Sequence, residues 1–356
     1  MALRPIVIAA GGTAGHVVPA LAVAAELRAE GARVVFVGGQ RAERRLVPEA
    51  GYELRTLTVE GLDRRHPVRA ARATGRAGRA LVGARAILAE VRPGAVLGGG
   101  GYVAGPVGAA AVSRRIPLVL TEADSHLGLS NRLLAPAARR VCLAFPIAGR
   151  DGPRYRVTGR PVPPAGGDRE RGRRSLGVAA DEQLVLVFGG SQGARSINRA
   201  AALGLAGGDF HVLHIAGARD YPELAAGELG ERYHLYEYLD IERFEDGLSA
   251  CDLVVARAGG SVFEIAAHGR PSVLVPYPHA TADHQTANAR HMAQAGAAVV
   301  LADAELTSAR LAREVAALLG DRGRLVAMGR SATAVARPRA ARDVAEELLG
   351  AAEARG

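Results

Sequence analysis

Short runs of aliphatic and β-branched residues alternate along the chain with stretches rich in Ala, Leu and Arg that have helical periodicity. This alternation predicts parallel strands joined by helices that cover both faces of a sheet. The predicted strands are Ile6–Ala9, Arg33–Val37, Ala95–Leu97, Leu118–Leu120, Leu184–Phe188, His211–Ile215, Leu253–Val255 and Ser272–Val275. The expected fold class is therefore α/β.

A strand followed by a glycine-rich turn and a helix occurs twice in each half of the chain. The four turns are Gly11–His16, Gly98–Tyr102, Gly189–Ala194 and Arg257–Ser261. Two copies of one plan, in a chain of 356 residues, predict two domains with similar folds.

The stretch Arg156–Arg174 has the composition of a linker, because it is rich in Pro, Gly and Arg. We therefore place the two domains at residues 1–160 and 161–338. A last helix is expected at 339–354, after Pro338, and it could pack back on the first domain.

The bulk composition is typical of a soluble globular protein, with 49% hydrophobic and 23% charged residues. Cys142 and Cys251 have neither a disulfide nor a zinc spacing, which favours a reducing cytoplasm. The segment Met1–Ile8 is typical of a strand rather than a signal peptide. Glycine and proline interrupt the longest uncharged run, Gly94–Ser113, so no membrane-spanning helix is expected.

The net charge is +9, and all 45 basic residues are arginine. Codon bias explains part of this content, but a basic surface also suits nucleic acid, anionic lipid or a phosphorylated substrate. The aromatic content of 4% and the absence of tryptophan weaken the case for base stacking.

A glycine turn between a strand and a helix brings backbone amides close to a ligand, and the helix N-terminus favours an anion such as phosphate. Pro19 is expected at the start of the first helix. The first turn, Gly11–His16, lacks the G-x-G-x-x-G spacing of dinucleotide sites, and the sequence has no Gly-Lys-Ser/Thr of a P-loop. These absences weaken the case for a dehydrogenase or an NTPase. They do not exclude a protein that binds a nucleotide sugar.

Four motifs resemble, in order, the signatures of the MurG family of glycosyltransferases. They are Gly11–Ala22, Gly100–Pro106, Gly189–Arg195 with Asn198, and Asp283–Asn288. The resemblance covers nearly the whole chain, although related glycosyltransferases share single motifs. It implies the GT-B fold, in which two Rossmann-like domains have parallel sheets that face a central cleft.

The resemblance implies that UDP-GlcNAc binds mainly to the second domain. Ser191 would contact the nucleotide, although a helix N-cap would also explain a serine there. Glu264 would bind the ribose hydroxyls, Gln285 the sugar hydroxyls and Ile241 the uracil. The remaining residues assigned to the donor are Thr13, Ala14, Gly15, Asp124, Gln192, Gly259, Gly260 and Ser261, of which the last three would hold the pyrophosphate.

His16 is the candidate catalytic base, because histidine titrates near neutral pH and the glycine turn would direct it into the cleft. The alternative is a histidine that caps the helix or binds phosphate without acid–base work. Glu122 would have a supporting role. Gly100, Gly101 and Tyr102 would line the loop for the acceptor pyrophosphate, although plain packing would also explain Tyr102.

Two segments depart from the pattern of the family. Thr121-Glu122-Ala123-Asp124 stands where the family usually has His-Glu-Gln-Asn, so Asp124 replaces the amide expected at the sugar. Pro163 stands where the family tends to have arginine, and Arg160 is the candidate replacement. These departures affect sugar positioning more than the fold.

The segment Leu62–Arg92 is strongly basic, and apolar residues such as Leu81 and Ile87 are interleaved with its arginines. Such a patch could lie on an anionic leaflet, held by charge and shallow apolar insertion. A solvated, arginine-rich helix is the alternative. The residues assigned to this membrane patch are Arg64, Arg65, Arg69, Arg72, Arg76 and Arg79.

The resemblance implies an inverting transfer of GlcNAc from UDP-GlcNAc to undecaprenyl-pyrophosphoryl-MurNAc-pentapeptide (lipid I), with a β-1,4 bond, in peptidoglycan synthesis on the cytoplasmic face of the membrane. It implies no metal or other cofactor, and the sequence has no Asp-x-Asp motif. The expected partners are lipid I, anionic phospholipid and a cell-wall or cell-division complex, but not nucleic acid. A related GT-B glycolipid glycosyltransferase, a UDP-GlcNAc 2-epimerase and a catalytically inactive UDP-sugar-binding protein remain as alternatives.

Overall fold

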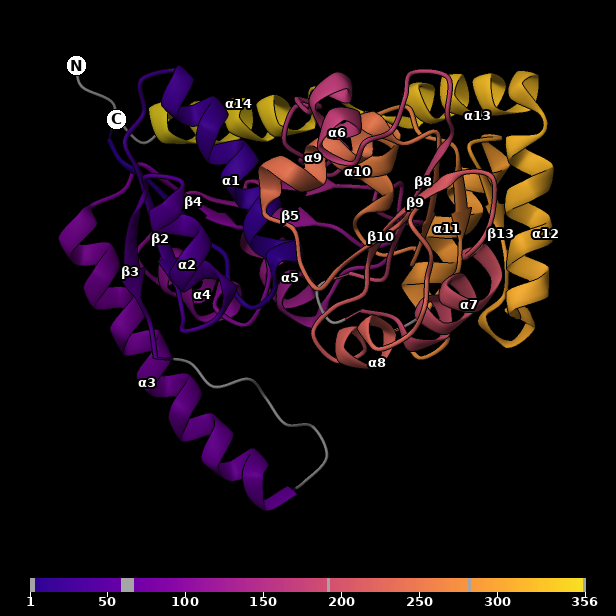
Figure 1. Cartoon of the computed structure of the whole chain (residues 1–356). Helices are drawn as coiled ribbons and strands as arrows, with labels where there is room; N and C mark the ends of the chain where they lie inside the picture. Colours follow the sequence, from indigo (N-terminus) through magenta and orange to yellow (C-terminus); the bar gives the residue numbers. More distant parts are fainter. Residues whose placement is uncertain (1–3, 59–66, 191–192, 281–282, 355–356) are drawn as a thin grey trace. The chain divides into compact units, whose positions relative to one another are not determined.

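A computed structural model describes residues 4–58, 67–190, 193–280 and 283–354, with the backbone alone for residues 67–77. The chain divides into two compact units (Figure 1), of which the first comprises Met1–Pro163 and Pro338–Gly356 and the second comprises Pro164–Arg337. Each unit contains one parallel sheet, which confirms the α/β class. Every strand predicted from the sequence is present, with small differences at the ends.

The first unit has a seven-stranded sheet in the order β3-β2-β1-β4-β5-β6-β7, and all neighbouring strands are parallel. Its strands are β1 Ile6–Ala9, β2 Val34–Gly38, β3 Glu53–Thr56, β4 Ala95–Gly98, β5 Leu118–Glu122, β6 Arg140–Leu143 and β7 Tyr155–Val157. Its helices are α1 Ala14–Ala29, α2 Ala42–Glu49, α3 Pro67–Val91, α4 Ala104–Ser113, α5 Leu129–Leu134, the 3-10 turn Ala135–Ala137 and α14 Ala340–Glu353.

The second unit has a six-stranded parallel sheet in the order β10-β9-β8-β11-β12-β13. Its strands are β8 Leu184–Phe188, β9 His211–Ile215, β10 Tyr233–Tyr236, β11 Leu253–Ala256, β12 Ser272–Leu274 and β13 Ala298–Val300. Its helices are α6 Arg169–Ser175, α7 Arg195–Leu205, α8 Tyr221–Ala225, α9 Ile241–Ala250, α10 Val262–Ala267, α11 His284–Gln294, the 3-10 turn Asp303–Glu305, α12 Ser308–Leu319 and α13 Arg322–Val335.

Both sheets share one topology, because the strand order reverses next to the first strand of each unit. The reversal lies between β1 and β4 in the first unit and between β8 and β11 in the second. Ligands of open α/β sheets bind at such switch points, beyond the carboxyl ends of the strands. The four glycine turns of the sequence follow these four strands.

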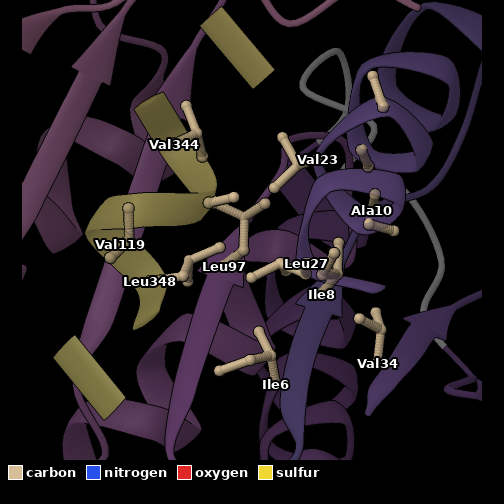
Figure 2. Close-up of a cluster of buried hydrophobic side chains, with 14 of the residues drawn as sticks. Ile6, Ile8, Ala10, Val23, Leu27, Val34, Leu97, Val119, Val344 and Leu348 are labelled. Carbon is tan, nitrogen blue, oxygen red and sulfur yellow. The ribbon is translucent and has the colours of Figure 1, made fainter. Parts of the chain in front are cut away.

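The central strands are buried along their whole length, as expected for parallel strands covered on both faces. Helix α14 covers part of the first sheet, and Figure 2 shows its Val344 and Leu348 among strand residues such as Leu97 and Val119. The last helix of the chain therefore completes the hydrophobic core of the first unit.

Part of the arginine content has a structural role within the second unit. Arg173 is only 5% exposed, and its Nη1 donates to the carbonyl of Ala250 at 2.9 Å. Arg169 and Arg270 also donate to carbonyls at the end of α9, including that of Cys251. Cations suit a helix C-terminus, where carbonyls lack helical partners, so these arginines stabilise the end of α9.

Among the helices of the described residues, none combines the length and the apolar character that crossing a bilayer requires.

Candidate active site

The first unit brings its predicted site residues to the carboxyl ends of three adjacent strands. Thr13, Ala14, Gly15 and His16 follow β1, Gly100–Tyr102 follow β4, and Glu122 and Asp124 lie at the end of β5. They therefore share the edge of the sheet where the strand order reverses.

His16 lies in the first turn of α1, against the loop that follows β4. Its Nδ1 atom is 3.4 Å from Thr13 Oγ1, and a Cβ atom added at Gly100 would lie 2.7 Å from its Cδ2. Burial lowers the pKa of His16, and the Arg160 guanidinium lowers it further, whereas Asp124 and Glu43 act in the opposite direction. The His16 imidazole therefore stays neutral at pH values somewhat below the usual histidine pKa, and a general base must be neutral to accept a proton.

Pro19 does not lie at the start of α1, contrary to the expectation from sequence. The helix begins at Ala14, so Pro19 lies in its second turn and cannot donate to the carbonyl of Gly15. Nη2 of Arg160 donates to that carbonyl instead. The proline thus creates an open acceptor, and the arginine that fills it stands close enough to influence His16.

Glu122 is 7% exposed, and both of its carboxylate oxygens bind the loop that follows β5. Oε1 accepts from the amide of Asp124 at 3.1 Å, and Oε2 accepts from the amide of Gly128 at 2.8 Å and from Asn131 Nδ2 at 2.9 Å. This bonding shapes the loop that carries Asp124.

The sequence did not single out Glu43, a fully buried acid in the first turn of α2. Its Oε2 accepts from the amide of Gly12 at 2.8 Å, and its Oε1 accepts from the amide of Gly39 and the hydroxyl of Tyr102, both at 2.8 Å. Burial alone would raise the pKa of Glu43, but hydrogen bonds from Gly12, Tyr102 and Gly39 outweigh it and hold the pKa below the usual value. The feature of the sequence that could have indicated Glu43 was the pair of glycines at the end of β2, followed by an acid.

In the second unit, the turn after β11 presents open backbone amides. The amides of Gly259, Gly260 and Ser261 have no backbone acceptor among the described residues. Ser261 is the N-cap of α10, but its side chain makes no capping bond. Consecutive free amides at a strand-to-helix turn can hold an anion such as a pyrophosphate.

Helix α11 supports this turn through two side chains. Gln285 accepts from the amide of Tyr277 at 2.9 Å, and its Nε2 would lie 3.8 Å from a Cβ atom added at Gly259. Asn288, one helical turn later, donates to the carbonyl of Ala258 at 3.0 Å. The structure therefore brings Gln285 to the predicted pyrophosphate turn.

The other predicted donor residues are more dispersed. Glu264 is half-buried in the first turn of α10, and Ile241 begins α9 with 43% of its surface exposed. Ser191 and Gln192 lie outside the described residues.

A half-buried cluster that sequence reasoning missed fixes the start of the same turn. Arg257 Nη1 donates to Asp303 Oδ1 at 2.5 Å, its Nη2 donates to Ser196 Oγ at 2.8 Å, and Ser196 donates to Asp303 at 2.6 Å. Burial would raise the pKa of Asp303, but the bonds from Ser196 and Arg257 hold it below its usual value. The arginine therefore anchors β11 to the 3-10 turn at Asp303.

Replacement of Arg160 by methionine is expected to raise the pKa of His16, because it removes a cation that disfavours the imidazolium. An NMR titration of the histidine rings, with the signal assigned by His16→Gln, measures this pKa. The matched control is Arg33→Met, which removes an exposed arginine paired with Glu53. A His16 pKa that stays constant or falls in the Arg160 variant would contradict this account.

Comparison with known proteins identifies the family. Residues 6–143 match the Glycosyltransferase family 28 N-terminal domain, and residues 184–347 match the Glycosyltransferase family 28 C-terminal domain. A relative from Moorella thermoacetica, named UDP-N-acetylglucosamine--N-acetylmuramyl-(pentapeptide) pyrophosphoryl-undecaprenol N-acetylglucosamine transferase, is 41% identical over 98% of this chain and 99% of its own length. The relative of the same name from Halorhodospira halophila is 43% identical over 97% of this chain and 98% of its own length.

Solved structures agree with these matches. MurG of Acinetobacter baumannii has a TM-score of 0.74 and 28% identity, over 97% of this chain and 99% of that chain. A UDP-GlcNAc 2-epimerase from Neisseria meningitidis, with a TM-score of 0.68, covers 97% of this chain and 100% of its own, but its 13% identity indicates a shared fold alone. Since the two family domains span most of the chain and the relatives match nearly its full length, the chain belongs to glycosyltransferase family 28.

Proposed function

We propose that this chain transfers N-acetylglucosamine from UDP-GlcNAc to the MurNAc C4 hydroxyl of lipid I, forming a β-1,4 bond with inversion in peptidoglycan synthesis. The names of both relatives support this reaction. Within the chain, the observation that carries the proposal is the turn Gly259–Ser261, whose open amides lie beside Gln285. Such a turn suits the diphosphate of a nucleotide sugar, with the amide of Gln285 near the sugar.

The proposed reaction needs a base for the acceptor and stabilisation for the leaving group. The C4 oxygen attacks the anomeric carbon, its proton passes to His16, and the bond from that carbon to the β-phosphate oxygen of UDP breaks. The charge that grows on UDP is stabilised by the preorganised amides of Gly259, Gly260 and Ser261. No metal or other cofactor is required in this proposal, and Glu264 and Ile241 keep their assigned roles at the ribose and uracil.

UDP release from UDP-GlcNAc, measured with and without a lipid I analogue, tests the proposed reaction. We expect release that depends on the analogue, together with a disaccharide product. Release without any acceptor, accompanied by N-acetylmannosamine, would instead indicate an epimerase, and transfer to diacylglycerol but not to the analogue would indicate a glycolipid glycosyltransferase. Binding of UDP-GlcNAc without turnover would indicate an inactive binding protein.

His16→Ala is expected to lower kcat by about 10²–10⁴-fold while the Kd for UDP-GlcNAc changes little, because a general base acts in the transition state. Steady-state kinetics and calorimetric titration separate the two quantities. His126→Ala, which changes another half-buried histidine of the first unit, is the control. Unchanged turnover would remove His16 from the mechanism.

We also propose that helix α3 docks the protein on the anionic, cytoplasmic face of the membrane. Arg79, Val82 and Arg85 are exposed and spaced by three residues, so they share one face of the helix, and Val82 is 68% exposed. The N-terminal half of α3 projects past the strands of its own sheet (Figure 1). Arg69, Arg72 and Arg76 belong to this half, whereas Arg64 and Arg65 lie outside the described residues.

A basic hollow at the other end of α3 supports the same proposal. It has a volume of about 710 Å³, and its lining includes Arg4, Arg85, Arg92 and Arg114 but no acidic residue. Among the described residues, only Arg85 of these four has a side-chain partner, the hydroxyl of Ser113. Unbalanced guanidinium groups beside the exposed face of α3 suit phosphate headgroups.

Charge reversal at Arg79 and Arg85 (R79E/R85E) is expected to abolish co-sedimentation with vesicles that contain phosphatidylglycerol. The control R322E/R324E makes the same change in net charge at exposed residues of α13, and it should leave binding intact. Equal, negligible binding of the unaltered protein to anionic and neutral vesicles, or equal losses in the two variants, would contradict the proposed docking face.

A further inference from the structure

Glu43 joins three loops of the first unit that are far apart in sequence. Its carboxylate binds Gly12 of the loop after β1, Gly39 of the loop after β2 and Tyr102 of the loop after β4. A third amide, that of Arg41, donates to Oε1 at 3.3 Å. The side chain is fully buried and forms no ion pair with any of the described residues, so its charge is balanced by these hydrogen bonds.

Glycines make room for this carboxylate and for its tyrosine partner. A Cβ atom added at Gly38 would lie 2.7 Å from Glu43 Cγ, and one at Gly11 would lie 3.0 Å from Oε1. A Cβ atom at Gly39 would overlap the Tyr102 hydroxyl, at 1.8 Å. Real Cβ atoms essentially never show contacts as short as those at Gly38 and Gly39, and the contact at Gly11 is unusually tight, so the backbone at these positions is shaped around the Glu43–Tyr102 pair.

The same loops form two walls of the His16 side chain. A Cβ atom added at Gly12 would lie 3.9 Å from His16 Nδ1 and 3.7 Å from Tyr102 Cδ1, while one at Gly100 would lie 2.7 Å from His16 Cδ2. Glu43 thus fixes Gly12 on one side of the imidazole and Tyr102, two residues beyond Gly100, on the other.

We propose that Glu43 is a positioning residue for the acceptor half of the reaction, holding His16 and Tyr102 in register by binding the Gly12 amide, the Gly39 amide and the Tyr102 hydroxyl together. The inference rests on the proposed function. Glu43 acts through its neighbours, and it neither takes a proton from the acceptor nor touches the donor.

Glu43→Gln tests this role because it keeps the size of the side chain but replaces one acceptor oxygen with an NH₂ group. In either orientation, that group faces an amide that itself donates, at Gly12 or at Gly39. We expect kcat to fall by about tenfold to a hundredfold, because small displacements of reacting groups cost that much. The KM for the lipid I analogue should rise, and the Kd for UDP-GlcNAc should stay within about twofold of the unaltered value.

Glu49→Gln is the matched control, since it makes the same change at the exposed last residue of α2 and should have no effect. Gly39→Ala tests the same contact by displacing the Tyr102 hydroxyl from Glu43. It should produce the same kinetic changes, and it replaces Glu43→Gln as the test if that variant fails to fold.

The pKa of His16 gives a readout that does not depend on turnover. The Glu43 charge raises that pKa against the lowering by burial and Arg160, with Asp124 as the other acid nearby. In Glu43→Gln the His16 pKa should therefore fall further, whereas loosening of the loop would admit water and raise it. Unchanged kcat, a parallel loss of UDP-GlcNAc binding, or a raised His16 pKa would overturn the proposal. Absence of lipid I-dependent turnover in the unaltered protein, with the His16 shift as expected, would overturn the proposed function alone.

Discussion

The close approach of loop backbones beyond the carboxyl ends of adjacent strands is the constraint on which the candidate site residues of each unit depend. A Cβ atom at Gly101 would lie 1.7 Å from the carbonyl oxygen of Gly11, and one at Gly193 would lie 2.1 Å from the carbonyl oxygen of Ala216. Both glycines also have positive φ angles, of 76° and 72°. Only glycine satisfies both conditions, so the loops can meet above the strands only with this residue at these positions.

The two units use one topology, but the turn after β1 and the turn after β11 differ in what their amides bind. In the first unit, the amide of Gly12 donates to the carboxylate of Glu43, so this amide already has an anionic acceptor within the protein. In the second unit, Gly259, Gly260 and Ser261 keep amides without a backbone acceptor among the described residues. An acid of the protein thus already binds the turn after β1, whereas the turn after β11 keeps amides for a ligand, which is consistent with the proposed position of the nucleotide diphosphate.

The sequence predicts the central strands and the turns that follow them, because buried parallel strands are continuous apolar runs and their turns need glycine. It did not predict β3, β6, β7, β10 or β13. β3 and β7 are exposed or half-buried and β10 and β13 are mostly half-buried, so these strands lack that pattern, whereas β6 is a short strand that begins with an arginine. The location of Pro19 was wrong because the periodicity of an alanine-rich helix does not mark its first residue. The partners of Glu43 and Arg257 could not be predicted, since Gly12 and Tyr102 are 31 and 59 residues from Glu43, and Asp303 is 46 residues from Arg257.

The first unit is discontinuous in the chain, since α14 returns to it after the second unit is complete. On the ribosome, the strands of the first sheet emerge long before Val344 and Leu348, which cover Leu97 and Val119 in the finished core. The second unit, which is continuous, has its whole sequence available earlier. A nascent chain therefore exposes an apolar face of the first sheet until α14 has been synthesised. Products that terminate before α14 carry an exposed apolar surface that chaperones and proteases can recognise.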